Sequence, residues 1–176
     1  MNNVVLIGYR GTGKSAVGKI LASRLDRMLF STDAEIETVA GKTIPEIVEQ
    51  QGWESFRDVE SQICQQLAGR QGLVVDTGGG IILRPQNVAV LKQLGTVFWL
   101  TASVETIAKR IGGDIQRPSL TGVKSFIDEI QDVLRERLPK YQTAADHVIE
   151  TEGKSLRQVA DEFRHDCRLS GRPSQP

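Results

Sequence analysis

A glycine-rich segment near the amino terminus has the residue types and spacing of a phosphate-binding loop. The segment Gly8–Ser15 fits the pattern G-x-x-x-x-G-K-[ST]. Its glycines allow backbone N–H groups to surround phosphate oxygens, Lys14 would reach the β- and γ-phosphates, and the Ser15 hydroxyl would contact Mg²⁺. The apolar segment Val4–Ile7 precedes the loop, and apolar residues at helical spacing follow it. The pattern therefore predicts a nucleotide site rather than an ordinary glycine-rich turn.

A second segment joins an apolar strand to a carboxylate and a run of glycines. Leu73–Val75 leads into Asp76, and Gly78–Gly80 follow directly after Thr77. A strand that ends in Asp resembles a Walker B element, whose carboxylate holds Mg²⁺. Three consecutive glycines would let the backbone approach another group closely, although a flexible turn is the alternative. The chain has no Asn-Lys-x-Asp sequence to read guanine, which disfavours a GTPase.

Further charged residues could act on a substrate, but each also has a purely structural interpretation. Asp33 lies between a predicted strand and helix, where it would also favour the helix dipole. Arg57 and Glu60 are three residues apart and could form an ion pair on a solvated helix face. Arg117 lies in a predicted mobile loop that could close over a transferred phosphoryl group. Arg137 lies late in a long predicted helix, where an arginine also favours the dipole.

Strand and helix patterns alternate along the chain, which predicts an α/β protein with a parallel sheet covered on both faces. The predicted strands are Val4–Ile7, Met28–Phe30, Leu73–Val75, Val97–Leu100 and His147–Ile149. The predicted helices are Lys14–Leu25, Ala34–Ala40, Ile44–Gln51, Trp53–Leu67, Pro85–Leu94, Val104–Ile111, Phe126–Thr143 and Leu156–Cys167. Ligands of such sheets bind beyond the carboxyl ends of the strands, where the candidate residues fall.

Local spacing also predicts how some helices begin and end. Three pairs have the spacing of a capping box: Thr32 with Glu35, Thr43 with Glu46, and Ser155 with Gln158. Gly41 stands where a helix end needs a left-handed residue.

Composition excludes several classes of protein. The 176 residues contain 22 Lys and Arg against 22 Asp and Glu, so net charge favours neither nucleic acid nor a membrane surface. No apolar run approaches the roughly 20 residues of a membrane span. The two cysteines, Cys64 and Cys167, and the two histidines suggest neither a disulfide framework nor a His-based metal site. We expect a cytoplasmic, monomeric protein with one domain over residues 1–168 and a disordered tail over 169–176.

Taken together, the motifs resemble those of the shikimate kinase family over about residues 3–165. The marks that carry the resemblance are Gly8–Ser15, Asp33-x-x-Ile36-Glu37, Phe56-Arg57-x-x-Glu60, Gly78–Gly80, Arg117-Pro118 and Arg137-x-Pro139-x-Tyr141. The resemblance implies a three-layer α/β/α P-loop fold like that of nucleoside monophosphate kinases, with a central five-stranded parallel sheet. It also implies transfer of the γ-phosphoryl group of ATP to the 3-hydroxyl of shikimate, a step of chorismate and aromatic amino-acid biosynthesis.

The resemblance assigns roles residue by residue. Lys14, Asp33 and Arg117 would be catalytic, with Asp33 holding the acceptor hydroxyls and Arg117 supplied by a lid over about residues 112–124. Glu60 would orient Arg57. Residues that would bind ATP are Gly11, Thr12, Gly13, Lys14, Ser15, Ala16, Arg110, Arg117 and Lys154. Residues that would bind shikimate are Asp33, Arg57, Gly78, Gly79, Gly80 and Arg137, with substrate-binding helices over about residues 33–61.

One departure from the family pattern concerns the metal. The family carries Asp-x-Asp where this chain has Ser31-Thr32-Asp33, so an aspartate that supports the Mg²⁺ shell is replaced by Ser31. Ser15 and Asp76 remain as candidate metal-shell groups, and Asp76 would compensate for the missing carboxylate. Two alternative functions stay open from the sequence: a kinase for another small hydroxy acid, and a non-catalytic ATP-binding regulatory module.

Overall fold

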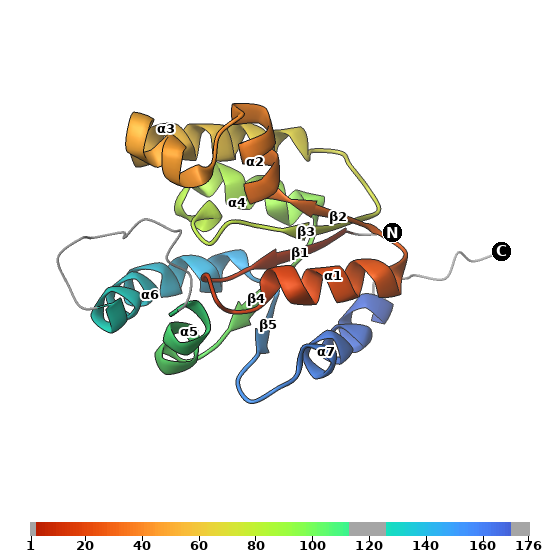
Figure 1. Ribbon diagram of the computed structural model, residues 1–176. Helices are drawn as coiled ribbons and strands as arrows, with labels where there is room; N and C mark the ends of the chain where they lie inside the picture. The colour runs from red at the N-terminus through yellow and green to blue at the C-terminus, as the bar shows by residue number, and fades with distance from the viewer. Residues whose placement is uncertain (1–2, 113–125, 170–176) are drawn as a thin grey trace.

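The computed structural model describes residues 3–112 and 126–169, which form a parallel sheet between layers of helices (Figure 1). The five strands lie in the order β2-β3-β1-β4-β5, and every pairing is parallel. Their bounds are β1 Asn3–Ile7, β2 Met28–Ser31, β3 Leu73–Asp76, β4 Gly95–Thr101 and β5 His147–Glu150. The central strand β1 is buried along its whole length, as a strand covered on both faces must be.

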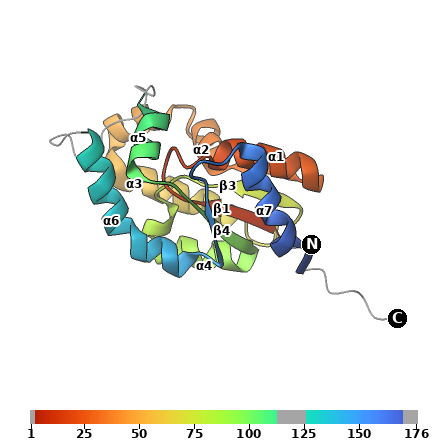
Figure 2. The same cartoon turned by 90° about the horizontal axis from the view of Figure 1, so that it is seen from below.

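Helices connect the strands and cover both faces of the sheet. Their bounds are α1 Lys14–Leu25, α2 Thr32–Ala40, α3 Ile44–Gln66, α4 Pro85–Leu94, α5 Val104–Ile111, α6 Phe126–Ala144 and α7 Leu156–Leu169, with a short 3₁₀ turn at Ile81–Leu83. One face packs its apolar side chains against α1 and α7, which Figure 2 shows side by side. The other face packs against α3, α4 and α6. The predicted three-layer α/β/α arrangement is confirmed.

The predicted strands are confirmed, each extended by one to three residues, and the predicted helices are confirmed except at one junction. The two helices expected over 44–51 and 53–67 form one continuous element, α3, that bends at Gly52. Gly52 has φ +80° and ψ 169°, a backbone conformation that favours glycine. The bend lets Ile47 and Phe56, from opposite sides of it, pack in one apolar cluster with Ile36 of α2.

Two of the three predicted capping boxes are confirmed, and one is wrong. Thr43 and Glu46 cap α3 reciprocally, and Ser155 and Gln158 do the same ahead of α7. At α2 the capping residue is Ser31, whose hydroxyl accepts from the Ala34 N–H at 3.3 Å. Thr32 is fully buried instead, and its hydroxyl accepts from the Gly78 N–H at 2.9 Å. Gly41 ends α2 in the predicted left-handed conformation, with φ +63°.

The carboxyl ends of the strands gather the predicted site residues at one edge of the sheet. Gly8 opens the glycine-rich loop there with φ +142°, and a Cβ at this position would lie 2.5 Å from the Leu100 carbonyl oxygen of β4. Only glycine therefore allows the loop to pass so close to the neighbouring strand. Within the described residues, each helix is too short or too polar to cross a membrane.

Candidate active site

A pocket opens at the amino end of α1, where the helix dipole and the loop N–H groups favour an anion. Its lining combines the loop with the ends of β2 and β3 and part of α5: Arg10, Gly11, Gly13, Lys14, Ser15, Ala16, Ser31, Asp33, Asp76, Thr77, Gly79, Arg110 and Ile111. We call this the phosphate pocket. It contains every predicted ATP-binding residue except Thr12, Lys154 and Arg117.

Two cations hold the shape of the phosphate pocket. The Lys14 ammonium is buried and donates to the Gly8 and Tyr9 carbonyl oxygens at 2.8 and 3.1 Å. The Arg110 guanidinium donates to the Gly11 carbonyl at 3.2 Å and to the Thr151 hydroxyl at 3.0 Å. Arg110 thus ties the loop to Thr151, in the segment directly after β5.

Two predicted ATP-binding side chains lie outside the phosphate pocket, and a third falls outside the described residues. The Thr12 hydroxyl is buried and donates to the Tyr9 carbonyl at 2.8 Å, so it stabilises the loop itself. The Lys154 ammonium pairs with Glu162 of α7 at 2.7 Å. Arg117 and the predicted lid, apart from Gly112, lie outside the residues that the structure describes.

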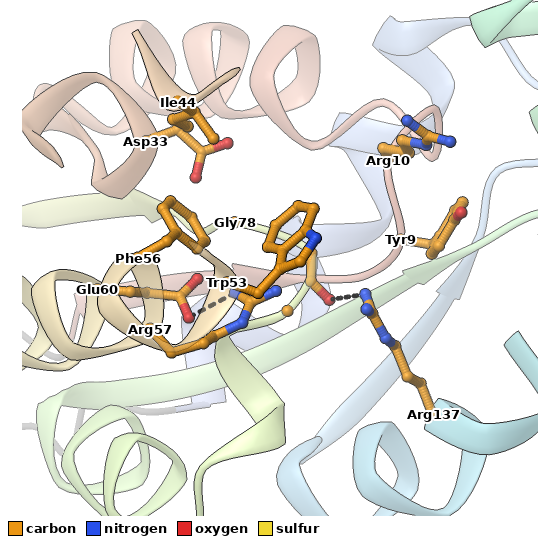
Figure 3. Close-up of a pocket in the computed structure, with 12 residues that line it drawn as sticks. Tyr9, Arg10, Asp33, Ile44, Trp53, Phe56, Arg57, Glu60, Gly78 and Arg137 are labelled. Carbon is orange, nitrogen blue, oxygen red and sulfur yellow. Dashed lines mark hydrogen bonds and ion pairs between the residues drawn. The ribbon is translucent and has the colours of Figure 1, made fainter. Parts of the chain in front are cut away.

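A second pocket adjoins the first and has both charged and apolar walls (Figure 3). Its lining comes from the loop, α2, α3, the glycine run and α6: Tyr9, Arg10, Asp33, Ile44, Trp53, Phe56, Arg57, Glu60, Gly78, Gly79, Gly80 and Arg137. We call this the acceptor pocket. All six residues predicted to bind the acceptor lie in it. Three guanidinium groups against two carboxylates give it an excess of positive charge, which favours an anionic ligand.

A buried ion pair fixes one arginine of the acceptor pocket. Arg57 Nη1 donates to Glu60 Oε2 at 2.7 Å, and Glu60 is completely buried. The exposed-pair interpretation of these two residues is therefore wrong. Burial raises the pKa of the Glu60 carboxyl above its ordinary value, and the attraction of Arg57 opposes that rise. The aromatic rings of Phe56 and Trp53 lie 4.9 and 5.6 Å from the Arg57 guanidinium and further restrict it.

The three consecutive glycines are explained by close approach. A Cβ on Gly78 would lie 2.5 Å from a carboxylate oxygen of Asp33, and one on Gly80 would lie 2.2 Å from Arg57 Nη2. A Cβ on Gly79 would lie 3.3 Å from the Gly8 carbonyl oxygen. The predicted close approach is confirmed, and the approaching groups are the charged side chains of the pocket and the loop backbone.

Arg137 enters the acceptor pocket from the opposite side, on α6 (Figure 3). Its Nη1 donates to the Gly79 carbonyl oxygen at 3.3 Å, and the Tyr141 hydroxyl donates to the same oxygen at 2.5 Å. Tyr141 is stacked on Trp99 of β4, with ring centroids 5.4 Å apart. The Arg-x-Pro-x-Tyr segment therefore anchors α6 to the glycine run and aims a second guanidinium at the pocket.

Comparison with known proteins assigns this arrangement to a family. The family model described as shikimate kinase matches residues 10–168. The chain belongs to the shikimate kinase family.

Relatives across the shikimate kinase family span nearly the whole chain. The shikimate kinase of Pelotomaculum thermopropionicum is 42% identical over 165 residues, covering 94% of this chain and 95% of that protein. The shikimate kinase of Nitratidesulfovibrio vulgaris is 46% identical over 149 residues, covering 83% of this chain and 85% of its own. A structure of shikimate kinase from Acinetobacter baumannii in complex with shikimate superposes with a TM-score of 0.91 at 35% identity, covering 98% of this chain and 96% of that one.

The fold extends beyond the shikimate kinase family. Deoxyadenosine kinase from M. mycoides with bound dCTP has a TM-score of 0.61 at 13% identity, over 95% of this chain and 99% of that one. That likeness shows the shared P-loop kinase fold alone.

Several pocket residues were not singled out from the sequence. Arg10 occupies a position that the loop pattern leaves free, and it lines both pockets. Trp53 lines the acceptor pocket. Thr32, interpreted from the sequence as a cap, lines neither pocket but accepts a hydrogen bond from Gly78 of the acceptor pocket. Their roles depend on which groups the sheet and α3 bring together, and no local spacing carries that information.

We expect Gly80→Ala to lower acceptor affinity while the fold and nucleotide binding persist. A Cβ there must displace the Arg57 guanidinium, and ångström-scale misplacement of a binding group costs about 100-fold. Steady-state kinetics would show this as a rise in acceptor KM. ADP affinity, measured by calorimetry, serves as the internal control because Gly80 does not line the phosphate pocket. Unchanged acceptor KM would contradict this account of the glycine run.

Proposed function

We propose that this protein is a shikimate kinase that transfers the γ-phosphoryl group of ATP to the 3-hydroxyl of shikimate, giving shikimate 3-phosphate and ADP. The observation that carries the proposal is the contact between two pockets, one built for phosphate and one for an anionic acceptor, with Asp33 lining both. Family membership, and the relative from A. baumannii whose structure contains shikimate, support the choice of acceptor.

The acceptor pocket suits a small carboxylated ring that carries hydroxyls. Arg57 and Arg137 can each hold a carboxylate through the planar fork of the guanidinium. Trp53, Phe56 and Ile44 supply apolar surface for a ring. Asp33 can accept hydrogen bonds from hydroxyl groups at the end of the pocket that meets the phosphate pocket.

Phosphoryl transfer depends mainly on positioning and charge neutralisation, and the chain supplies both. The N–H groups of the glycine-rich loop and the Lys14 ammonium would hold the phosphates. Asp33 would orient the attacking hydroxyl and accept its proton. Arg117, from outside the described residues, would neutralise charge as the lid closes and excludes water. We expect Arg117 to affect kcat far more than the KM for shikimate.

The phosphate pocket also has suitable donors for Mg²⁺, which would neutralise phosphate charge when bound. Magnesium in kinase sites takes one or two protein oxygens and keeps several waters. The Ser15 hydroxyl and the Asp76 carboxylate both line the phosphate pocket. Asp76 of β3 and Ser31 of β2 are direct partners in the register of these two adjacent strands. We propose that Asp76 replaces the carboxylate that the family pattern has at Ser31.

Removal of the Asp76 carboxylate is expected to weaken metal affinity. We expect Asp76→Ala to raise the Mg²⁺ concentration for half-maximal turnover by about 10-fold or more, a typical effect for groups that support a metal shell. Mn²⁺ binding to the ADP complex, followed by electron paramagnetic resonance, gives a readout independent of turnover. Ser31→Asp added to Asp76→Ala should restore affinity, and Asp is also a good capping residue for α2.

Asp58→Ala is the matched control, because Asp58 is 65% exposed and pairs with Arg84 on the surface. If Asp76→Ala left the Mg²⁺ dependence unchanged, the proposed compensation would be wrong.

The proposed function is tested by supplying the purified protein with ATP, Mg²⁺ and a panel of hydroxy acids. We expect ADP release with shikimate and formation of shikimate 3-phosphate, identified by mass spectrometry. Turnover on a different hydroxy acid would favour the alternative of another small-molecule kinase. ATP binding without turnover on any acceptor would favour a regulatory module. The cytoplasmic location and the monomeric state stay predictions, which fractionation and light scattering would check.

A further inference from the structure

The two pockets share three residues, and one of them is a cation that no assigned role accounts for. Asp33, Gly79 and Arg10 line both the acceptor pocket and the phosphate pocket. Among the cations of the described lining, Lys14 and Arg110 line only the phosphate pocket, and Arg57 and Arg137 only the acceptor pocket. Arg10 is therefore the described cation at the junction where a hydroxyl and a phosphoryl group would meet.

The backbone that carries Arg10 is held firmly. The Tyr9 carbonyl, directly before it, accepts hydrogen bonds from the Thr12 hydroxyl at 2.8 Å and from Lys14 at 3.1 Å. A Cβ on Gly79 would lie 3.4 Å from the Arg10 nitrogen, so the glycine run packs against this peptide. Groups that are fixed in advance stabilise developing charge best, because they need no reorganisation during reaction.

The Arg10 side chain is placed but incompletely bonded. Its guanidinium carbon lies 5.8 Å from the centroid of the Tyr9 ring, which itself lines the acceptor pocket (Figure 3). Arg10 Nε is buried and has no hydrogen-bond partner among the described residues. Buried N–H groups in folded proteins are nearly always bonded, so the described protein contacts leave the bonding capacity of this guanidinium partly unused.

We propose that Arg10 is a further catalytic residue, which binds the transferred phosphoryl group at the junction of the two pockets and stabilises it during transfer. This inference rests on the proposed kinase function. In phosphoryl transfer the negative charge spreads over the equatorial oxygens of the moving group. A guanidinium can donate to two such oxygens at once, and Asp33 on the same junction would hold the hydroxyl.

The test compares Arg10→Met, Arg10→Lys and the control Arg24→Met. Arg24 lies on α1 behind the loop, and its ion pair with Asp161 is on the surface. We expect Arg10→Met to lower kcat about 100-fold, as loss of one preorganised donor does, and to change the KM for shikimate and for ATP less than about threefold. Arg10→Lys keeps the charge but loses the fork, so its kcat should fall about 10-fold. Arg24→Met should retain wild-type kinetics.

Binding of a transition-state mimic supplies a second readout. Affinity for ADP with aluminium fluoride, Mg²⁺ and shikimate should fall in Arg10→Met by the same factor as kcat. Affinities for ADP alone and for shikimate alone should stay at wild-type values. Trp53 fluorescence can follow acceptor binding, because Trp53 lines that pocket.

The outcomes separate this inference from the proposed function. A raised KM for shikimate at unchanged kcat would make Arg10 an acceptor-binding residue and overturn the inference, and so would unchanged kinetics. Should Arg10→Met fail to fold, the kcat of Arg10→Lys and its affinity for the transition-state mimic decide whether Arg10 is catalytic. Turnover of the acceptor panel by the wild-type protein tests the proposed function first. The kcat of Arg10→Met relative to wild type is then measured with whichever acceptor is turned over.

Discussion

Asp33→Asn is expected to lower kcat by about 1000-fold, within the range that positioned acid–base groups contribute. Asp33 lines both pockets, at the amino end of α2, and packs so tightly against Gly78 that a Cβ there would lie 2.5 Å from its carboxylate. An amide of the same shape can still receive a hydrogen bond from the acceptor through its oxygen. It can neither take up the hydroxyl proton nor hold the hydroxyl through a full negative charge.

The kinetic signature distinguishes this role from simple binding. The KM for ATP should stay near the wild-type value, and the KM for shikimate should rise far less than kcat falls. Glu35→Gln removes a carboxylate from the same turn of α2 and is the matched control, because Glu35 lines a separate groove along β2. A normal kcat in Asp33→Asn would show that Asp33 is not catalytic and that another group accepts the proton of the hydroxyl.

The strands and most of the helices could be predicted from the sequence, because the strands are short apolar runs separated by segments of clear helical periodicity. Val4–Ile7 and Leu73–Val75 read as buried strands since both faces of the sheet are covered. Local spacing failed at Gly52, because a glycine that bends a helix and one that ends it look the same in a sequence. The order of the strands came from the structure alone, because periodicity does not say which strands are neighbours.

The sequence selected residues that the structure brings together in two adjoining pockets, but it did not predict their long-range contacts. Arg57 and Glu60 have the spacing of a surface pair, and only the packing of α3 against the glycine run buries them. Thr32 has the spacing of a cap, but its hydroxyl accepts a hydrogen bond from the Gly78 N–H, in the segment after β3. The loop pattern allows any residue at position 10, so it does not single out Arg10. Arg10 lies between two pockets, and the second of them is built by segments far from the loop in sequence.

Arg57→Met is expected to cost about 3–5 kcal/mol of unfolding free energy, because it leaves the buried Glu60 charge without its partner. The same change removes one of the two guanidinium groups that would hold the acceptor carboxylate. Acceptor KM should therefore rise by about 100-fold or more, as loss of a charge-assisted pair does. Denaturant unfolding and steady-state kinetics measure the two effects separately.

The double variant Arg57→Met/Glu60→Gln separates stability from recognition. Gln is neutral, so the uncompensated charge is gone and most of the unfolding free energy should return. Acceptor affinity should stay low, because neither side chain can hold a carboxylate. Arg84→Met is the control for loss of an arginine, since its carboxylate partners Glu54 and Asp58 lie exposed on α3. Recovery of acceptor affinity in the double variant would contradict the role of Arg57 in binding.

The stability of Arg57→Met should depend on pH, because the variant keeps the buried carboxyl of Glu60. Burial already raises the pKa of Glu60, and loss of the Arg57 attraction would raise that pKa further. The folded state would then bind a proton that the unfolded state releases, so stability falls as pH rises above the ordinary pKa of a glutamate. Acidification from neutral pH should therefore stabilise Arg57→Met relative to wild type, and the effect should be absent in the double variant. A stability difference that did not change with pH would show that Glu60 stays charged after its partner is lost.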